Sequence, residues 1–119
     1  MTREILFTEV QCNKHLSSVE DALYVLGGKW KLRIMIALFS GHKRFNDLQR
    51  TINGISARVL SSELKQLELN GLLTREVQPD QFPVIVEYIP TQYASTLKDV
   101  VSALAEWGQK HKKKITAKS

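Results

Sequence analysis

The sequence predicts a fold of the α+β class, mostly α-helical, in which several helices surround one β-hairpin. Two short helical patterns separated by a glycine-containing turn occupy residues 44–70. Directly after Gly71, the repeat of the hydrophobic residues changes from the helical period to the strand period. A long helical stripe then runs from Tyr93 to Trp107. This order of elements fits one domain, as does the length of 119 residues.

The composition fits a globular protein with a polyanionic partner. Hydrophobic residues make up 43% of the chain, which is enough for a core, and the formal net charge is +5. The single cysteine excludes an internal disulfide and fits a reducing compartment. No stretch approaches the roughly 20 apolar residues of a membrane span, and the N-terminus lacks a signal-peptide pattern. We therefore expect a cytoplasmic protein with no membrane partner.

The N-terminal part is expected to contain an irregular arm, residues 1–16, and a helix that begins at Ser17 or Ser18. Ser17 and Glu20 match a capping box, in which two side chains bond the free backbone amides at a helix start. A second helix is expected over residues 29–40, apolar over so much of its circumference that it belongs at the centre of the core. The apolar face of the first helix comprises Val19, Ala22, Leu23 and Leu26.

Residues 44–70 form a helix-turn-helix pattern. Each of the two helices has apolar residues at the spacing of one helix face. Asn53 and Gly54 tolerate the left-handed backbone that a tight turn needs, and Ser56 is the expected N-cap of the second helix. This second helix is expected to run to about Asn70. The apolar residues of the two helices are Phe45, Leu48, Ile52, Leu60, Leu64 and Leu67.

The outer face of the second helix is basic and rich in hydroxyls. Helical geometry places four polar residues nearly opposite its leucine stripe, with no acid among them. The second helix of a helix-turn-helix can enter the major groove of DNA. In that position, Arg58 is suited to a bidentate contact with guanine, and Lys65 is suited to a phosphate contact. Ser61 and Ser62 are suited to base edges or phosphates, and Ser56 to a phosphate at the helix N-terminus. A solvated helix that only packs on a core would fit the pattern almost as well.

Two β-rich runs, residues 72–77 and 84–89, flank a loop with proline and aspartate and are expected to form a hairpin. A hairpin directly after a helix-turn-helix is a wing, whose tip can lie along the DNA backbone or in the minor groove. Arg75 is the nearby cation, although a hairpin that only covers the core explains it equally well. Lys43 and Arg44 are further phosphate candidates, and Arg44 fits an ion pair inside the subunit equally well.

A last helix is expected after Pro90, with Thr91 as its N-cap. Its apolar stripe is four turns long, which is more than a domain of this size needs for its own core. We expect the stripe to pack against the same helix of a second subunit. The rival interpretation is that the helix folds back onto the first two helices. The predicted dimer interface comprises Leu97, Val100, Val101, Leu104 and Trp107.

The chain is thus expected to consist of the N-terminal arm, a winged-helix domain with its C-terminal helix (residues 17–113), and a basic tail (residues 114–119). The first and last helices of the domain are the expected dimerisation helices. The lysines near the end are expected to lie in a frayed, solvated segment with some attraction to phosphates. These lysines are Lys110, Lys112, Lys113, Lys114 and Lys118.

Several sequence blocks occur in a characteristic order and together span roughly residues 12–111. They are Gly27-Gly28-Lys29-Trp30, Gly41-x-x-Arg44-Phe45-x-x-Leu48, Gly54-Ile55-Ser56, Leu60-x-x-x-Leu64-x-x-Leu67-Glu68-x-x-Gly71-Leu72, Pro83-x-x-Val86-Glu87-Tyr88 and Trp107. In this order the blocks resemble the HxlR family of bacterial transcriptional regulators. The resemblance implies a dimeric winged-helix DNA-binding protein that is related in architecture to the MarR group and acts as a repressor or an activator.

The resemblance also concerns Cys12. Some HxlR members sense oxidants or electrophiles through a cysteine ahead of the first helix, and Cys12 lies in that region, which makes it a candidate redox sensor. The alternative is an inert, half-buried apolar residue. Asn13 stands where the family often has a proline after the cysteine. Two further departures, Pro90 for leucine and Ala94 for glycine, bear on how the last helix begins.

We therefore predict a homodimer that binds double-stranded DNA at a pseudo-palindromic operator and regulates transcription at the nucleoid. The sequence has no glycine-rich phosphate loop and no nucleophile motif, so we expect neither an enzyme nor a cofactor. Cys12 and His15 lack a second pair of ligands, so we expect no metal. One alternative is a winged helix that binds protein instead of DNA. Another is a regulator gated by an unidentified small molecule, bound between the dimer helices and the DNA-binding part.

Overall fold

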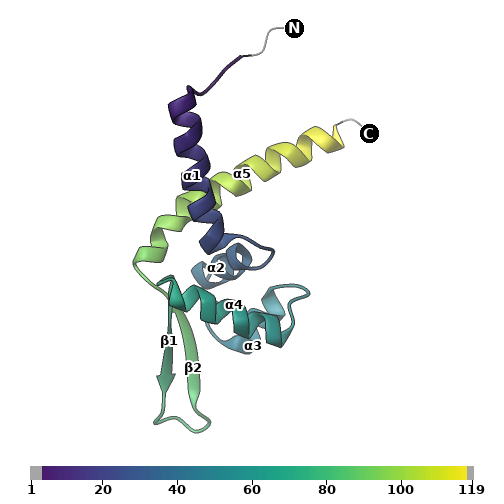
Figure 1. Ribbon diagram of the computed structural model, residues 1–119. Helices are drawn as coiled ribbons and strands as arrows, with labels where there is room; N and C mark the ends of the chain where they lie inside the picture. The colour runs from purple at the N-terminus through teal and green to yellow at the C-terminus, as the bar shows by residue number, and fades with distance from the viewer. Residues whose placement is uncertain (1–3, 118–119) are drawn as a thin grey trace.

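The computed structural model describes residues 4–117. Two long helices extend from a compact body, and a hairpin projects from the opposite side of that body (Figure 1). This mostly helical chain with a two-stranded antiparallel sheet confirms the predicted α+β class. The elements in order are α1 (Glu9–Leu26), α2 (Lys31–Phe39), α3 (Phe45–Thr51), α4 (Ala57–Leu69), β1 (Leu73–Gln78), β2 (Ile85–Pro90), a 3-10 turn (Tyr93–Thr96) and α5 (Leu97–Thr116).

The core lies in the body, where α2, α3, α4 and the first residue of β1 meet. Helix α2 is central to it, as predicted, because four of its nine residues are buried. The predicted stripe of α4 is also buried, with all three leucines at most 1% exposed. The largest fully buried side chains are Ile34, Met35, Leu48, Leu60, Leu64, Leu67 and Leu73.

Helix α1 begins earlier than the sequence analysis predicted. It starts at Glu9, and only residues 4–8 of the described N-terminus are irregular. Thr8 Oγ1 accepts a hydrogen bond from Gln11 N at 3.2 Å, and Gln11 Oε1 accepts one from Thr8 N at 3.0 Å. Thr8-x-x-Gln11 therefore forms the capping box that was assigned to Ser17 and Glu20. Both Thr8-x-x-Gln11 and Ser17-x-x-Glu20 match the capping-box sequence, but α1 begins at the first of them.

The helix-turn-helix and the hairpin form as predicted. Ser56 caps α4, with its Oγ accepting a hydrogen bond from Val59 N at 3.1 Å. Gly54 and Gly71 adopt positive φ angles of 87° and 77°, at the turn before α4 and after its end. Strands β1 and β2 pair in antiparallel register, with Leu73 opposite Pro90.

The start of the last helix differs from the prediction. Thr91 Oγ1 does accept a hydrogen bond from Ala94 N at 3.1 Å, but the cap serves a 3-10 turn, and α5 begins only at Leu97. The same hydroxyl donates to the Gly71 carbonyl at 2.7 Å. Because Ala94 is fully buried, this turn is tied to the body before α5 leaves it.

Helices α1 and α5 contain no buried residue. The radius of gyration is 18.2 Å, whereas a compact chain of this length is expected to have one of roughly 13–14 Å. Among the described residues, the first turns of α5 contact the body: Leu97 packs against the core, and Lys98 Nζ lies 5.7 Å from the Phe39 ring. The remainder of α5 does not fold back.

The basic tail is more ordered than predicted. Helix α5 continues to Thr116, so Lys110 and the lysines at 112–114 belong to a helix and not to a frayed end. Lys118 lies outside the described residues. Within residues 4–117, no helix combines the length and the apolar character that crossing a membrane requires.

Candidate nucleic-acid interface

The outer face of α4 is an exposed basic surface of the helix-turn-helix. Arg58, Ser61, Ser62 and Lys65 are all exposed, opposite the buried leucines. Within residues 4–117, neither Arg58 nor Lys65 makes an ion pair, so both charges are available to a ligand. Ser56, at the N-terminus of the same helix, is exposed as well, although its hydroxyl already caps the backbone. The structure therefore brings these five predicted residues together on one helix.

A hollow between α4 and the wing adds Arg75 to this surface. The hollow has a volume of about 230 Å³ and is lined on the α4 side by Ser61 and Lys65, and on the wing side by Arg75 and Tyr88. Arg75 lies opposite Tyr88 in the ladder, close to the base of the wing. Two cations and a hydroxyl in one hollow suit a phosphate group. Glu68 lies at the same hollow and partly offsets this positive potential.

The tip of the wing has a different character. Residues 79–84 contain no lysine or arginine and carry one acid, Asp80. Phe82 is fully exposed there, and Val84 is 53% exposed. The tip therefore exposes apolar side chains beside one acid, and the wing's cation is Arg75. The sequence analysis passed over this feature, although the run Phe82-Pro83-Val84 was visible in the sequence.

Lys43 and Arg44 have separate environments. Lys43 Nζ lies 3.2 Å from Glu87 Oε2, and the Lys43 carbonyl accepts a hydrogen bond from Tyr88 N at 2.8 Å. These contacts join the segment before α3 to β2, and they give Lys43 an internal partner. Arg44 is exposed and makes no ion pair among the described residues. The internal ion pair that the sequence analysis considered for Arg44 is thus made by its neighbour.

Helix α2 supports α4 through a partly buried ion pair. Lys31 Nζ lies 2.8 Å from Glu63 Oε2, and the two side chains are only 12% and 18% exposed. The two groups are not aligned for a hydrogen bond, so the Lys31 ammonium balances the Glu63 carboxylate through charge attraction. A buried charge left without its partner is strongly destabilising. The pair therefore fixes the inner side of α4 against α2.

Trp30 supports the turn that precedes α4. Lys29 Nζ lies 4.7 Å and the Arg33 guanidinium carbon 5.6 Å from the centre of its ring, which are cation–π distances. A Cβ atom added to Gly54 would lie 3.9 Å from the Trp30 ring. Sequence reasoning missed the supporting role of Trp30 and Lys31, although the block Gly27-Gly28-Lys29-Trp30 marked the place.

The residues predicted for the dimer interface divide between two directions. Leu97 and Val101 are half-buried toward the body, whereas Val100, Leu104 and Trp107 are 46%, 53% and 64% exposed. Helix α1 carries a second exposed apolar surface, which includes Cys12 as an exposed free thiol. No group of three or more His, Cys, Asp or Glu side chains in the described part of the chain is placed to hold a metal ion.

Sequence relatives of the chain are transcriptional regulators. The profile of the HxlR-like helix-turn-helix family matches residues 25–116. An uncharacterized HTH-type transcriptional regulator of Bacillus subtilis (strain 168), YdeP, is 39% identical over 97 residues, which are 82% of this chain and 75% of that protein. An uncharacterized HTH-type transcriptional regulator of Methanothermobacter thermautotrophicus is 39% identical over 97 residues, which are 82% of this chain and 73% of the relative.

Solved structures with the same fold include winged-helix regulators. The redox regulator HypR in its reduced form superposes with a TM-score of 0.76 at 37% identity, over 84% of this chain and 98% of that one. A MarR-family regulator from Enterococcus faecalis V583 gives a TM-score of 0.73 at 34% identity, over 98% of this chain and 99% of its own. The reduced form of the transcriptional regulator YodB from B. subtilis gives a TM-score of 0.67 at 36% identity, over 76% of this chain and 87% of that one.

Proposed function

We propose, on the premise that this chain belongs to the HxlR-like helix-turn-helix family and is a DNA-binding transcriptional regulator, that it acts as a homodimer on a pseudo-palindromic operator. The observation that carries the proposal is the outer face of α4, where Arg58 and Lys65 are exposed and make no ion pair with residues 4–117. A helix of this kind enters the major groove and reads base edges from its N-terminal half. Arg58 is one residue from that N-terminus.

The other predicted contacts follow from their positions around α4. Ser61 and Ser62 share its outer face with Lys65, and Arg75 lies across the hollow from Ser61 and Lys65. We assign Lys65, Arg75 and Arg44 to phosphates, because exposed cations beside a recognition helix set its register on the duplex. Lys43 is the weakest candidate, because a phosphate would compete with Glu87 for its ammonium group.

The second subunit is proposed to cover the apolar surfaces of α1 and α5. Three large side chains of α5 project away from the body, and α1 exposes Val19 and Leu23. Exposed apolar surface of this extent is typical of a protein–protein interface. The two helices extend from one side of the body, so a symmetric partner can join them without covering α4 (Figure 1).

Selection of bound sequences from a pool of random duplexes tests this proposal. We expect enrichment of two inverted half-sites whose centres are about 10 base pairs apart, because the recognition helices of such dimers lie one helical turn of DNA apart. The relatives are named as regulators, and we infer that the chain binds DNA at the nucleoid in the cytoplasm and catalyses no reaction. No enrichment with folded protein would favour a winged helix that binds another protein.

A redox input through Cys12 is a second candidate function. It is favoured by the exposed thiol in α1 and by the likeness to HypR, which is described as a redox regulator and is known in reduced and oxidized forms. Cys12 is the only cysteine, so oxidation must join two subunits or cap the thiol with a small molecule. To test this redox input, DNA affinity is measured for the parent and for Cys12→Ser, each with and without diamide. Loss of affinity in the treated parent alone supports the switch, and four equal values exclude it.

A further inference from the structure

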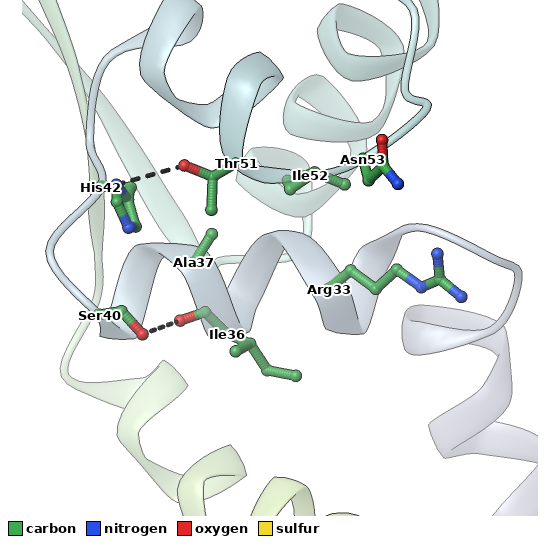
Figure 2. Close-up of a pocket in the computed structure, with 8 residues that line it drawn as sticks. All are labelled: Arg33, Ile36, Ala37, Ser40, His42, Thr51, Ile52 and Asn53. Atoms are coloured by element: carbon green, nitrogen blue, oxygen red, sulfur yellow. Dashed lines mark hydrogen bonds between the residues drawn. The ribbon is translucent and has the colours of Figure 1, made fainter.

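A groove with a volume of about 270 Å³ lies between α2 and the end of α3. Its walls come from two parts of the chain, α2 and the segment that ends α3 and begins the turn. In Figure 2, Ala37 of α2 points toward Thr51 and Ile52, and Ile36 lies on the other edge of α2. None of the residues proposed to contact DNA lines this groove. A ligand in the groove and DNA on α4 can therefore be bound at the same time.

The floor of the groove is apolar. Ala37 and Ile52 are buried, whereas Ile36 is 45% exposed although it lies in the middle of the central helix α2. The exposed part of Ile36 offers hydrophobic contact to whatever enters the groove. The groove volume lies just below the range of about 300–1,000 Å³ that is typical of ligand pockets, which suits a ligand of one ring or a short branched chain.

The two ends of the groove are polar, and one carries a cation. Arg33 and Asn53 lie at one end, and His42 and Thr51 lie at the other (Figure 2). Within residues 4–117, Arg33 makes no ion pair, and its guanidinium lies over the Trp30 ring, which limits its freedom. A planar guanidinium presents a fork of N–H donors that matches a carboxylate.

The opposite end is already satisfied by internal contacts. His42 Nδ1 lies 2.7 Å from Asp47 Oδ2, and since a carboxylate only accepts, this nitrogen donates to Asp47. Thr51 Oγ1 lies 3.5 Å from the same nitrogen (Figure 2). The free charge of the groove is therefore at Arg33, and an anionic group is expected to bind there with its apolar part over Ile36 and Ile52.

We propose that this groove binds a small monocarboxylate with an apolar body, such as an aryl or branched-chain acid, and that its occupancy regulates DNA binding. The regulatory half of the proposal rests on the proposed function. One wall belongs to α2, and the other leads through Asn53 and the turn directly into α4. A ligand that wedges between these walls favours a different placement of α4, and it changes DNA affinity to the extent that it binds the two placements unequally.

Binding is tested with the full chain, labelled with ¹⁵N and titrated with phenylacetate in the absence of DNA. We expect saturable amide shifts concentrated at residues 33–40 and 51–53, with half-saturation at or below about 1 mM. Phenylacetamide has nearly the same shape without the charge and should bind at least about 10-fold more weakly. No saturable shifts with phenylacetate, or shifts confined to α1 and α5, would overturn the site, including the case in which a second subunit covers the groove.

A pair of variants identifies the cation. Arg33→Gln should weaken phenylacetate binding about 10-fold, whereas Lys29→Gln should change it less than about 2-fold. The two substitutions remove the same charge from the same Trp30 ring, but only Arg33 lines the groove. Equal effects of both variants would show general attraction of anions and would overturn the assignment.

The regulatory half is tested by measuring DNA affinity with and without saturating phenylacetate. We expect a decrease of about 5-fold or more, which is the lower end of ordinary allosteric coupling. The parent should show this decrease, and Arg33→Gln should not. Unchanged DNA affinity with a saturated groove would overturn regulation alone, whereas a protein that binds phenylacetate but no DNA would overturn the proposed function and leave the site intact.

Discussion

Helices α4 and α5 carry apolar stripes of the same kind, but they use them in opposite ways. In α4, Leu60, Leu64 and Leu67 are at most 1% exposed, and the polar face looks outward. In α5, Val100, Leu104 and Trp107 are 46–64% exposed, and the helix has no buried residue. Amphipathic character alone therefore does not say what a helix packs against.

This difference separates two surfaces of the molecule. The body positions α4 through its own core and through the ion pair of Lys31 with Glu63, so the surface that we propose to contact DNA is complete within one subunit. The apolar surfaces of α1 and α5 are exposed in one subunit, and the proposed second subunit would cover them. In the proposed dimer, each subunit contributes a complete α4 surface, and the two subunits associate through the exposed faces of α1 and α5.

The largest expected effect breaks the α5 side of this comparison. Leu104→Gln combined with Trp107→Gln should produce a folded monomer, because both side chains project from α5 into solvent. DNA affinity should fall by about 10²–10⁴-fold, since two linked half-sites gain that much from effective concentration. Sedimentation and fluorescence anisotropy measure the two quantities. Gln109→Ala, on the same helix, is the control, and a parent chain that sediments as a monomer at micromolar concentration refutes the dimer.

The α4 side is tested by a core substitution. Leu64→Ala should lower the free energy of unfolding by about 2–5 kcal/mol, because it leaves a cavity in the body. Leu69→Ala is the matched control on the same helix, since Leu69 is 77% exposed, and its effect should stay within about 0.5 kcal/mol. Urea unfolding at one fixed protein concentration gives both values. Equal losses for the two variants contradict the burial pattern of α4.

A smaller effect separates base reading from phosphate contact on the outer face of α4. Arg58→Ala should cost about 1–3 kcal/mol of binding to the preferred operator and relax specificity at one base pair. Lys65→Ala should weaken all duplexes similarly and reduce the salt slope by about 1. Anisotropy titrations at several salt concentrations distinguish the two. If both folded variants bind like the parent, α4 is not the reading helix.

The smallest expected effect sharpens the role of the α4 N-terminus. Ser56→Ala should destabilise the fold by about 1 kcal/mol, because its hydroxyl caps the Val59 amide. Ser62→Ala removes the same hydroxyl from the outer face, where no hydrogen bond to the residues at 4–117 depends on it, and should leave stability unchanged. Thermal unfolding of the two variants makes the comparison. A larger loss from Ser62→Ala shows that the outer face has a structural role.

Local sequence patterns predicted much of the body. Three features of the body depend on interactions within a few residues and could be predicted from the sequence. They are the turn at Gly54, the cap at Ser56 and the leucine spacing of α4. The same locality explains the error in α1. Thr8-x-x-Gln11 and Ser17-x-x-Glu20 satisfy the same capping rule, and nothing local ranks them.

The candidate site was predicted in part. The outer face of α4 followed from helical periodicity, whereas the hollow that adds Arg75 required the angle between the wing and α4. The pairing of Lys43 with Glu87 joins positions that are far apart in the sequence, so no local pattern indicated it. The apolar groove beside Arg33 likewise depends on how α2 meets the end of α3.

The sequence by itself determined the order of the elements, the residues on each helix face and the membership in a family of regulators. The tertiary structure decided which of those faces are covered: α4 buries its stripe, while α5 departs from the body after its first turns. The physical reason is that periodicity and capping depend on neighbours in the chain. Burial depends on which distant elements come to lie opposite, and that is settled only when the whole chain has packed.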